Sequence, residues 1–157
     1  MYNICLRMLR SEAEAEDQLQ RSFVDVFTHI QQFGFKSSIG AWIKRIVVNN
    51  CINQLRKKSL LTEELADHHL NTPTDDPIAF AEDTDCSYKV AEIQEALLQL
   101  PDGYRTVFTL YLLEGYDHQE IGEILGISEA TSKSQYSRAK RKLRELLDTH
   151  RDRLVKL

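Results

Sequence analysis

Residues 119–146 read QEIGEILGISEATSKSQYSRAKRKLREL, and this stretch decides the interpretation of the chain. Ile121, Ile124 and Leu125 recur at three- and four-residue steps, which predicts a short helix with one apolar face. Gly126 suits the turn that follows, and Ser128 is a residue type that caps helix N-termini, so a second helix is expected from Glu129 to about residue 150. Two helices joined by a short glycine-containing turn form a helix-turn-helix, whose second helix can enter the major groove of DNA.

The predicted second helix carries polar and basic side chains along one face. These candidates for a −35-type DNA contact are Lys133, Ser134, Ser137, Arg138 and Arg141, with Gln135 beside them. Lys and Arg supply charge for phosphates and donors for guanine, and Gln can pair with adenine. The opposite face is apolar and should pack inward; it contains Tyr136, Ala139, Leu143 and Leu146. A merely solvated basic face is the alternative, but the turn and the caps on both helices favour DNA binding.

Two further helices are expected before the motif. An apolar pattern from Val90 to Leu100 predicts the first, which Pro101 ends. Apolar residues over 107–113 predict the second, which Gly115 ends. The pair Asp117 and Glu120 fits a capping box that opens the next helix. Residues 87–157 are therefore predicted to form one helical domain.

The beginning of the chain predicts a second helical domain, residues 1–58. The residues before Ser11 resemble the tail of an earlier helix. Ser11 and Glu14 then fit a capping box that opens a long helix, which should end at Gly34. A single inward stripe is expected along the long helix: Leu19, Phe23, Val26, Phe27, Ile30 and Phe33. The loop FKSS leads to another helix with the stripe Ile39, Trp42, Ile43, Ile46 and Val47. That helix is predicted to end in the basic cluster Arg56, Lys57 and Lys58.

Residues 59–86 differ in character, since they contain two prolines, many carboxylates and little periodicity. They predict a flexible acidic linker, with His68 and His69 as solvated linker residues. The fold class is therefore all-α, with two small helical domains on a flexible joint. No stretch of the sequence shows the pattern that predicts a β-strand.

The net charge of −4 conceals two basic ends. Residues 1–58 hold nine basic and five acidic side chains, and residues 128–157 hold nine and four. The middle is acidic: residues 59–100 hold one basic and ten acidic side chains, and residues 101–127 hold one basic and five acidic side chains. This distribution predicts contact with a polyanion at two places.

Several classes of protein are disfavoured by the pattern. No run approaches the ~20 apolar residues of a bilayer span, and the N-terminus does not resemble a signal peptide, so we expect a cytoplasmic protein without membrane insertion. Cys5, Cys51 and Cys86 are far apart and lack metal-ligand spacing, which favours reduced thiols and no metal. No catalytic set is visible, so we expect no enzyme activity and no cofactor.

Nearly the whole chain resembles an extracytoplasmic-function (ECF) sigma factor, a small two-domain member of the bacterial sigma-70 family. AEDQLQRSFVDVFTHIQQF resembles the helix that docks on RNA polymerase, and FKSSIGAWIKRIVVNNCINQLRKK resembles the −10 reading and melting region. LPDGYRTVFTLYLLEGYDHQEIGEILGISEATSKSQYSRAKRKL resembles the −35 reading region. The resemblance begins inside the first helix of the family, so the first bundle is expected to be weaker or to be completed by another chain.

The resemblance implies residue roles in the first domain. Asp17 and Gln20 match contacts to the β′ clamp helices of polymerase, whereas Arg21 departs from an acidic residue. The loop and helix residues implied at the −10 element are Lys36, Ser37, Ser38, Lys44, Arg45, Asn49, Arg56 and Lys57, continuing to Lys58. Asn49 has an amide that can read a flipped base edge. Trp42 could stack on a base, but its place in the apolar stripe favours the core.

In the second domain, Lys133, Ser134 and Arg138 match family contacts to the −35 element. Ser132 and Gln135 depart from the common Val and Arg, so an unusual −35 sequence is expected. The implied partners are promoter DNA, core RNA polymerase through its β′ clamp helices and β flap, and an anti-sigma factor. Two alternatives stay open, namely a stand-alone helix-turn-helix regulator and a protein-interaction module that docks a regulator.

Overall fold

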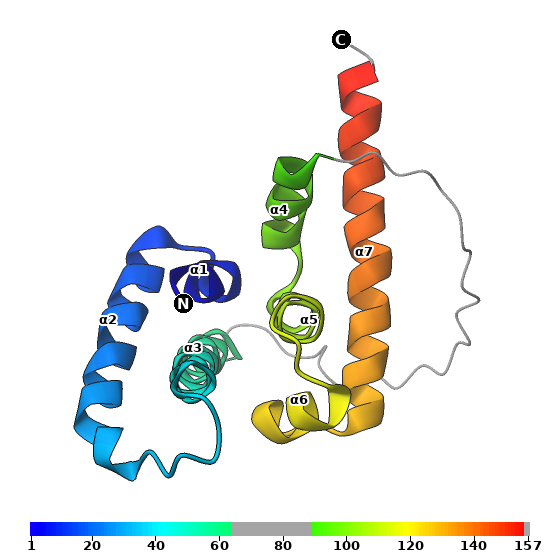
Figure 1. Ribbon diagram of the computed structural model, residues 1–157. Coiled ribbons are helices and arrows are strands. Elements are labelled where there is room, and N and C mark those ends of the chain that lie inside the picture. The colour runs from blue at the N-terminus through cyan, green and yellow to red at the C-terminus, as the bar shows by residue number, and fades with distance from the viewer. Residues whose placement is uncertain (64–88, 156–157) are drawn as a thin grey trace. The chain divides into compact units, whose positions relative to one another are not determined.

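The computed structural model describes residues 1–63 and 89–155, and the chain separates into two compact units between His68 and His69. Every regular element in the described ranges is helical, which confirms the all-α prediction (Figure 1). Most of the predicted linker lies outside the described residues, and so do His68, His69 and Cys86.

The first unit consists of α1 (Tyr2–Leu9), α2 (Glu12–His29) and α3 (Ile39–Glu63). The backbone of Arg10 takes the left-handed conformation, with φ at 64°, and thereby ends α1. Ser11 caps α2, since its hydroxyl accepts the N–H of Glu14 at 3.4 Å. The Glu14 carboxylate does not complete a capping box but pairs with Lys58, which ties the start of α2 to α3.

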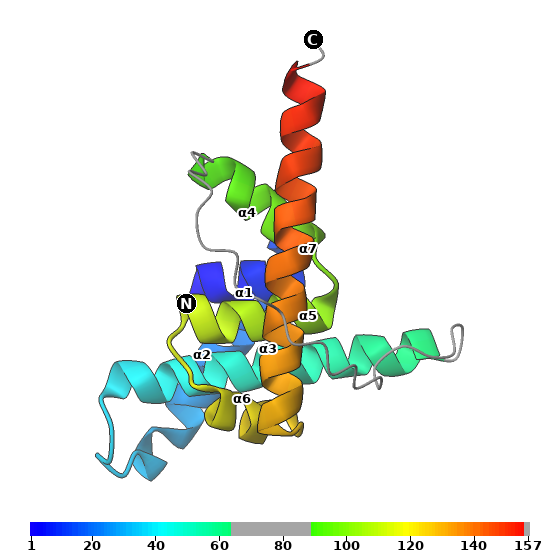
Figure 2. The ribbon, with the colours of Figure 1, turned by 90° about the vertical axis from the view of Figure 1, so that its right-hand side faces the viewer.

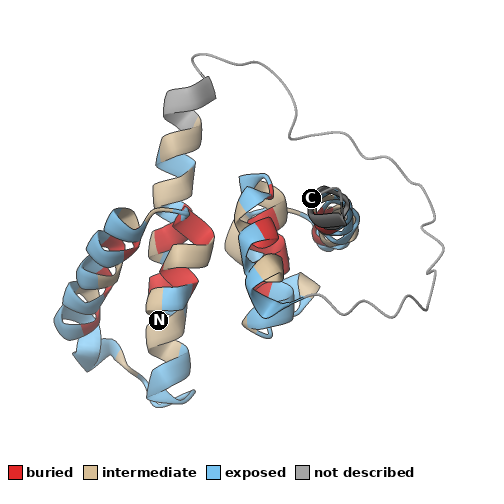
Figure 3. Ribbon diagram, turned by 90° about the horizontal axis from the view of Figure 1, so that it is seen from above, coloured by how far each residue is buried: buried red, intermediate tan, exposed pale blue. Residues whose placement is uncertain are grey.

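The core of the first unit lies where α1 and α2 pack against α3. Fully buried side chains line these contacts: Cys5, Met8, Ala15, Val47, Val48 and Cys51. In Figure 3 the buried residues of each unit lie where its helices face one another. The thiols of Cys5 and Cys51 are both free and share a hydrogen bond, which lowers the pKa of Cys5 and, together with burial, raises that of Cys51. The reduced-thiol expectation fits both.

The inward stripe predicted along α2 is wrong for half of its members, although Val26 is buried and Leu19 and Phe33 are half-buried. The buried residues of this helix are Ala15, Gln18, Ser22 and Val26. Phe23, Phe27 and Ile30 are instead exposed, Phe27 at 75%. Small side chains on the buried face let α2 approach its neighbours closely, so the large apolar groups lie on the other side of the helix.

Two predicted helix ends also differ. Helix α2 stops at His29 and is followed by the single 3₁₀ turn η1 (Ile30–Gln32). The residue with positive φ is then Phe35, not Gly34. Helix α3 runs to Glu63, past the predicted boundary at residue 58, because SLLTE contains no proline or glycine to stop it.

The second unit is organised around α7 (Glu129–Val155), which packs against α4 (Val90–Gln99), α5 (Asp102–Phe108) and α6 (His118–Leu125) (Figure 2). A π-helical turn, η2 (Thr109–Leu113), continues α5. The predicted inward face of α7 is confirmed, because Ala139 and Leu143 are buried with Leu147, and Tyr136 and Leu146 pack against them. Gly115 follows η2 with φ at 79°, as expected for a helix end.

Arg105 holds the turn between α4 and α5 although it is itself 1% exposed. Its guanidinium donates to the Leu100 carbonyl at 2.8 Å and to the Asp102 carboxylate at 2.7 Å. A buried charge is tolerated only with such partners, so Arg105 serves the frame of the unit.

Candidate nucleic-acid interface

The helix-turn-helix is built from local caps, as predicted. Asp117 accepts the Glu120 N–H at 2.7 Å, and the Glu120 carboxylate accepts the Asp117 N–H at 2.9 Å, which completes the capping box of α6. Gly126 takes a φ of 72° and ends α6. The Ser128 hydroxyl then accepts the Thr131 N–H at 3.0 Å and starts α7. These bonds fix where each helix begins and ends.

Gly122 sets how closely the two helices approach, and the sequence analysis missed it. A Cβ at this position would lie 2.8 Å from the carbonyl oxygen of Ile127 in the turn. Because that neighbour is backbone, it cannot move aside like a flexible side chain. The signal available in the sequence was a glycine in the middle of an otherwise regular helical pattern.

His118 and Ser132 join α6 to α7. Ser132 is fully buried, and its hydroxyl shares a 2.9 Å hydrogen bond with Nδ1 of His118. The imidazole stacks on Tyr111 with ring centroids 4.2 Å apart and planes 11° from parallel. Burial lowers the pKa of His118, and the charge of Lys133 lowers it further. Ser132 is therefore a partner of His118 and lies on the side of α7 away from the predicted DNA contacts.

The outward face of α7 contains most of the predicted −35 residues. Ser134, Ser137 and Arg141 follow at three- and four-residue steps opposite the buried Ala139, with Lys133 and Arg138 on its flanks. Lys133 pairs with Glu129 at 2.6 Å, and this hydrogen bond raises the pKa of Lys133. The Lys133 side chain is 60% exposed, so the pair is weak enough to be exchanged for a phosphate.

Gln135 lies on a different side of α7. It is half-buried, and its Oε1 would lie 3.9 Å from a Cβ built on Gly103 of α5. The residue thus faces the neighbouring helix, on the flank away from Ser137.

In the first unit, α3 presents a second basic face. Arg45, Asn49 and Arg56 are exposed and spaced by four and seven residues, which places them on one side of the helix. Lys44 is half-buried off this face, and Lys57 lies on the flank toward α2. The structure therefore brings three of the eight −10 candidates together on α3.

The loop candidates Lys36, Ser37 and Ser38 are exposed just before α3. Ser38 caps the helix, since its hydroxyl accepts the Ala41 N–H at 3.2 Å. The loop thus delivers its side chains at the N-terminus of α3, where unpaired N–H groups favour anions.

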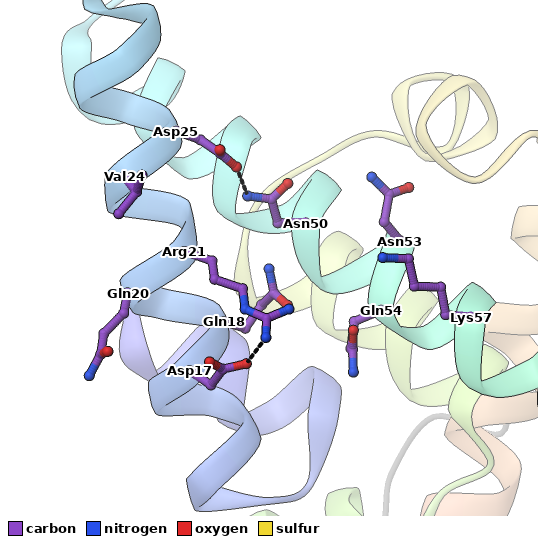
Figure 4. Close-up of a pocket in the computed structure, with 10 residues that line it drawn as sticks. All are labelled: Asp17, Gln18, Gln20, Arg21, Val24, Asp25, Asn50, Asn53, Gln54 and Lys57. Atoms are coloured by element: carbon purple, nitrogen blue, oxygen red, sulfur yellow. Dashed lines mark hydrogen bonds and ion pairs between the residues drawn. The ribbon is translucent and has the colours of Figure 1, made fainter.

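An open groove of about 480 Å³ separates α2 from α3 (Figure 4). The three predicted polymerase contacts, Asp17, Gln20 and Arg21, lie on its α2 side, and Lys57 lies on its α3 side. Arg21 reaches from α2 into this space and pairs with Asp17 at 3.0 Å. The positive charge of Arg21 is therefore balanced within α2.

Asn50 closes the upper part of this groove by joining the two helices. Its amide donates to the Asp25 carboxylate at 2.7 Å (Figure 4). It also donates to the Ser22 hydroxyl at 3.2 Å. The sequence analysis chose Asn49 for DNA and did not consider its neighbour. The two amides point in different directions, so α3 uses one for packing and exposes the other.

Two classes of site find no support within residues 1–63 and 89–155. No helix there combines the length and apolar character that a membrane crossing requires. In the same ranges no three His, Cys, Asp or Glu side chains gather as metal ligands.

Comparison with known proteins assigns a family to each of the two units. The family "Sigma-70 region 2" matches residues 1–60, and "Sigma-70, region 4" matches residues 91–143. The ECF RNA polymerase sigma factor SigW of Bacillus subtilis is 34% identical over 154 residues, which cover 94% of this chain and 82% of SigW. The chain belongs to the ECF sigma factors of the sigma-70 family.

Other sigma factors give the same picture. SigM of Bacillus subtilis is 32% identical over 93% of this chain and 87% of its own length. SigM of Mycobacterium tuberculosis is 29% identical, over 88% of this chain and 66% of its own length. As a sigma factor, the protein binds core RNA polymerase and directs it to promoters, and it catalyses no reaction itself.

A solved sigma factor shares the fold. RpoE of Bartonella quintana, crystallised with the anti-sigma factor NepR, superposes with a TM-score of 0.64 at 22% identity, covering 94% of this chain and 89% of RpoE.

Proposed function

We propose that the two units divide promoter recognition between them. The α3 face of Arg45, Asn49 and Arg56, with the loop before it, takes the −10 element, and the outward face of α7 takes the −35 element. This proposal rests on the observation that each unit presents its own exposed basic face on a long helix. Phosphate contacts at both faces give affinity, and base contacts give the sequence preference.

The exposed apolar side of α2 fits polymerase docking. Val24 is 64% exposed and Phe27 is 75% exposed. The polar side chains Asp17 and Gln20 precede them on the same helix, by about one to three turns. A large apolar patch with a polar rim is typical of a protein-binding surface and costs solubility if it stays uncovered. A partner on this side would account for the exposure of Phe23, Phe27 and Ile30, which had been predicted as core.

A regulator of the anti-sigma class is the second proposed partner, because the solved relative RpoE was crystallised with NepR. We place the protein in the cytoplasm, where polymerase meets promoters. The start of the second domain at residue 87 remains part of this proposal.

Reconstitution with core polymerase tests the division. A promoter fragment is first selected from a random library with the wild-type holoenzyme. An Arg45→Ala and Arg56→Ala double variant should then bind core polymerase normally and lose protection and opening around −10. An Arg141→Ala variant should lose protection around −35. Footprints that do not depend on the altered face would refute the assignment. A footprint by the chain alone would favour a stand-alone regulator.

A further inference from the structure

His118 stands at the start of α6, and other elements hold its ring on two sides. Nδ1 shares the 2.9 Å hydrogen bond with the Ser132 hydroxyl of α7, and the imidazole stacks on Tyr111 of η2 with ring centroids 4.2 Å apart. The ring centroid of Tyr136, also from α7, lies 5.7 Å away. These contacts fix the place of the imidazole in the helix-turn-helix, where α6 packs against the beginning of α7 (Figure 1).

The same contacts do not prevent the imidazole from taking up a proton. A serine hydroxyl both donates and accepts hydrogen bonds, so Ser132 suits the bare Nδ1 of the neutral ring and the Nδ1–H of the protonated ring. His118 is only half-buried, so protons from solvent reach it. The link between α6 and α7 therefore survives protonation, and what changes is the charge of the ring.

Charged and titratable groups from three elements surround this ring: Asp117 of α6, Glu129, Lys133 and Tyr136 of α7, and Tyr111 of η2. Burial lowers the pKa of His118, and the charge of Lys133 lowers it further. The carboxylates of Glu129 and Asp117 act in the opposite direction. Without DNA the ring is therefore mostly neutral at about pH 7.

A DNA phosphate at Lys133 would change this balance. The Lys133 side chain is 60% exposed and pairs with Glu129 at 2.6 Å, so it is available to a phosphate. That phosphate would offset the lysine charge and bring negative charge near His118. An anion close to an imidazole raises its pKa, because it favours the charged form. Phosphate binding at Lys133 and proton uptake by His118 would then strengthen one another reciprocally.

We propose that His118 is a proton-linked residue of −35 binding: its protonation adds a positive charge beside Lys133 and strengthens the contact of the second unit with the promoter backbone as the pH falls. This rests on the proposed −35 role of the outward face of α7 and adds a residue from α6. Because phosphates are the same in every sequence, His118 contributes affinity and a pH dependence, and the base preference comes from other side chains.

The test compares variants of the chain in the holoenzyme. The probe is a fluorescent duplex that carries the selected −35 element and no −10 element, so that no base has to leave the stack. His118→Gln removes the titratable ring and keeps an amide that can bond to Ser132. His29→Gln is the matched control, since His29 is an exposed histidine of α2 whose Nδ1 lies 2.8 Å from the Asp25 carbonyl oxygen. Affinity is measured by anisotropy at about pH 8 and about pH 6, each over a range of salt concentrations.

Lowering the pH should tighten binding by wild type about fivefold more than binding by His118→Gln, at roughly 0.1 M salt. The slope of log affinity against log salt should also steepen by up to about 0.9 more in wild type, which corresponds to one further phosphate. His29→Gln should respond as wild type does. A purely structural role of His118 would instead lower the affinity of the variant at both pH values and leave the difference in salt slope at zero.

Equal pH responses of wild type and His118→Gln would overturn the proposal and leave the −35 assignment intact. A wild-type affinity that decreases more than that of the variant as the pH is lowered would also overturn it, because His118 would then act only through the stability of the unit. If a scrambled −35 element binds as tightly as the selected one at the higher pH, the proposed function itself fails.

Discussion

Replacing Asn50 by Ala should loosen α2 from α3 and thereby destabilise the first unit. The Asn50 amide makes the 2.7 Å bond to Asp25 and the 3.2 Å bond to Ser22, and both partners lie on α2. The Ser22 hydroxyl also donates to the Gln18 carbonyl at 2.7 Å, so it stays satisfied after the change. The loss therefore falls mainly on the charged Asp25 bond.

The magnitude follows from these contacts. A hydrogen bond to a charged group contributes roughly 1.5–3 kcal/mol, and the partial exposure of Asn50 and Asp25 places this one at the low end. The longer bond to Ser22 adds about 0.5 kcal/mol. Ala gains about 0.5 kcal/mol of helix propensity over Asn. The net loss should be about 1.5 kcal/mol, which at a urea dependence of roughly 1 kcal/mol per molar lowers the midpoint by about 1.5 M.

Trp42 makes the measurement specific, because it is the single tryptophan of the chain and lies in the first unit. Its fluorescence should follow urea unfolding of that unit alone. Asn53→Ala is the matched control, since Asn53 is exposed on the same helix and gains the same propensity. A double-mutant cycle with Asp25→Ala should give a coupling of about 1 kcal/mol. Equal midpoints for the two Asn variants, or a coupling near zero, would refute the reasoning.

Three further outcomes are expected. Arg138→Ala should weaken −35 recognition without changing core-polymerase affinity, and an unaltered promoter preference in library selection would count against it. Because burial lowers the folded-state pKa of His118, its contribution to stability is present above the unfolded-state pKa and is lost as pH falls through the folded value. The melting temperature measured by circular dichroism should therefore fall as the pH is lowered from about 7 to 5, and it should fall less in His118→Gln. An equal dependence of the melting temperature on pH in wild type and variant would contradict this. Gly122→Val should destabilise the second unit by roughly 2 kcal/mol, because the new side chain would clash with the Ile127 carbonyl oxygen. Gly40→Ala, where nothing lies within 4 Å of the added Cβ, should change stability by less than about 1 kcal/mol. Similar losses of stability in the two variants would exclude the close approach as the cause.

Much of the architecture could be predicted because its signals are local. The Asp117 box, the Gly126 turn and the Ser128 cap each involve residues within four positions of one another, so their spacing in the sequence is their spacing in space. The outward face of α7 followed from helical periodicity for the same reason. Gln135 was grouped with that face because it is a neighbour in sequence, but it is two residues from Ser137 and therefore lies on the opposite side of α7, toward α5.

The α2 stripe shows where this reasoning stops. Periodicity correctly gathered Phe23, Phe27 and Ile30 on one side of a helix, but it could not tell whether the unit itself or a partner covers that side. Nothing local distinguishes the two, because burial depends on elements far away in the chain or on another molecule.

By itself the sequence determined that this protein has two helical units, that the second contains a helix-turn-helix, and that both ends are basic; these properties depend on backbone bonds and side chains a few residues apart. Only the tertiary structure decided that Asn50 joins helices while Asn49 stays outside, that Ser132 meets His118, and that Tyr111 stacks on that imidazole. Those outcomes depend on distances between segments brought together by packing, and no spacing along the chain encodes them.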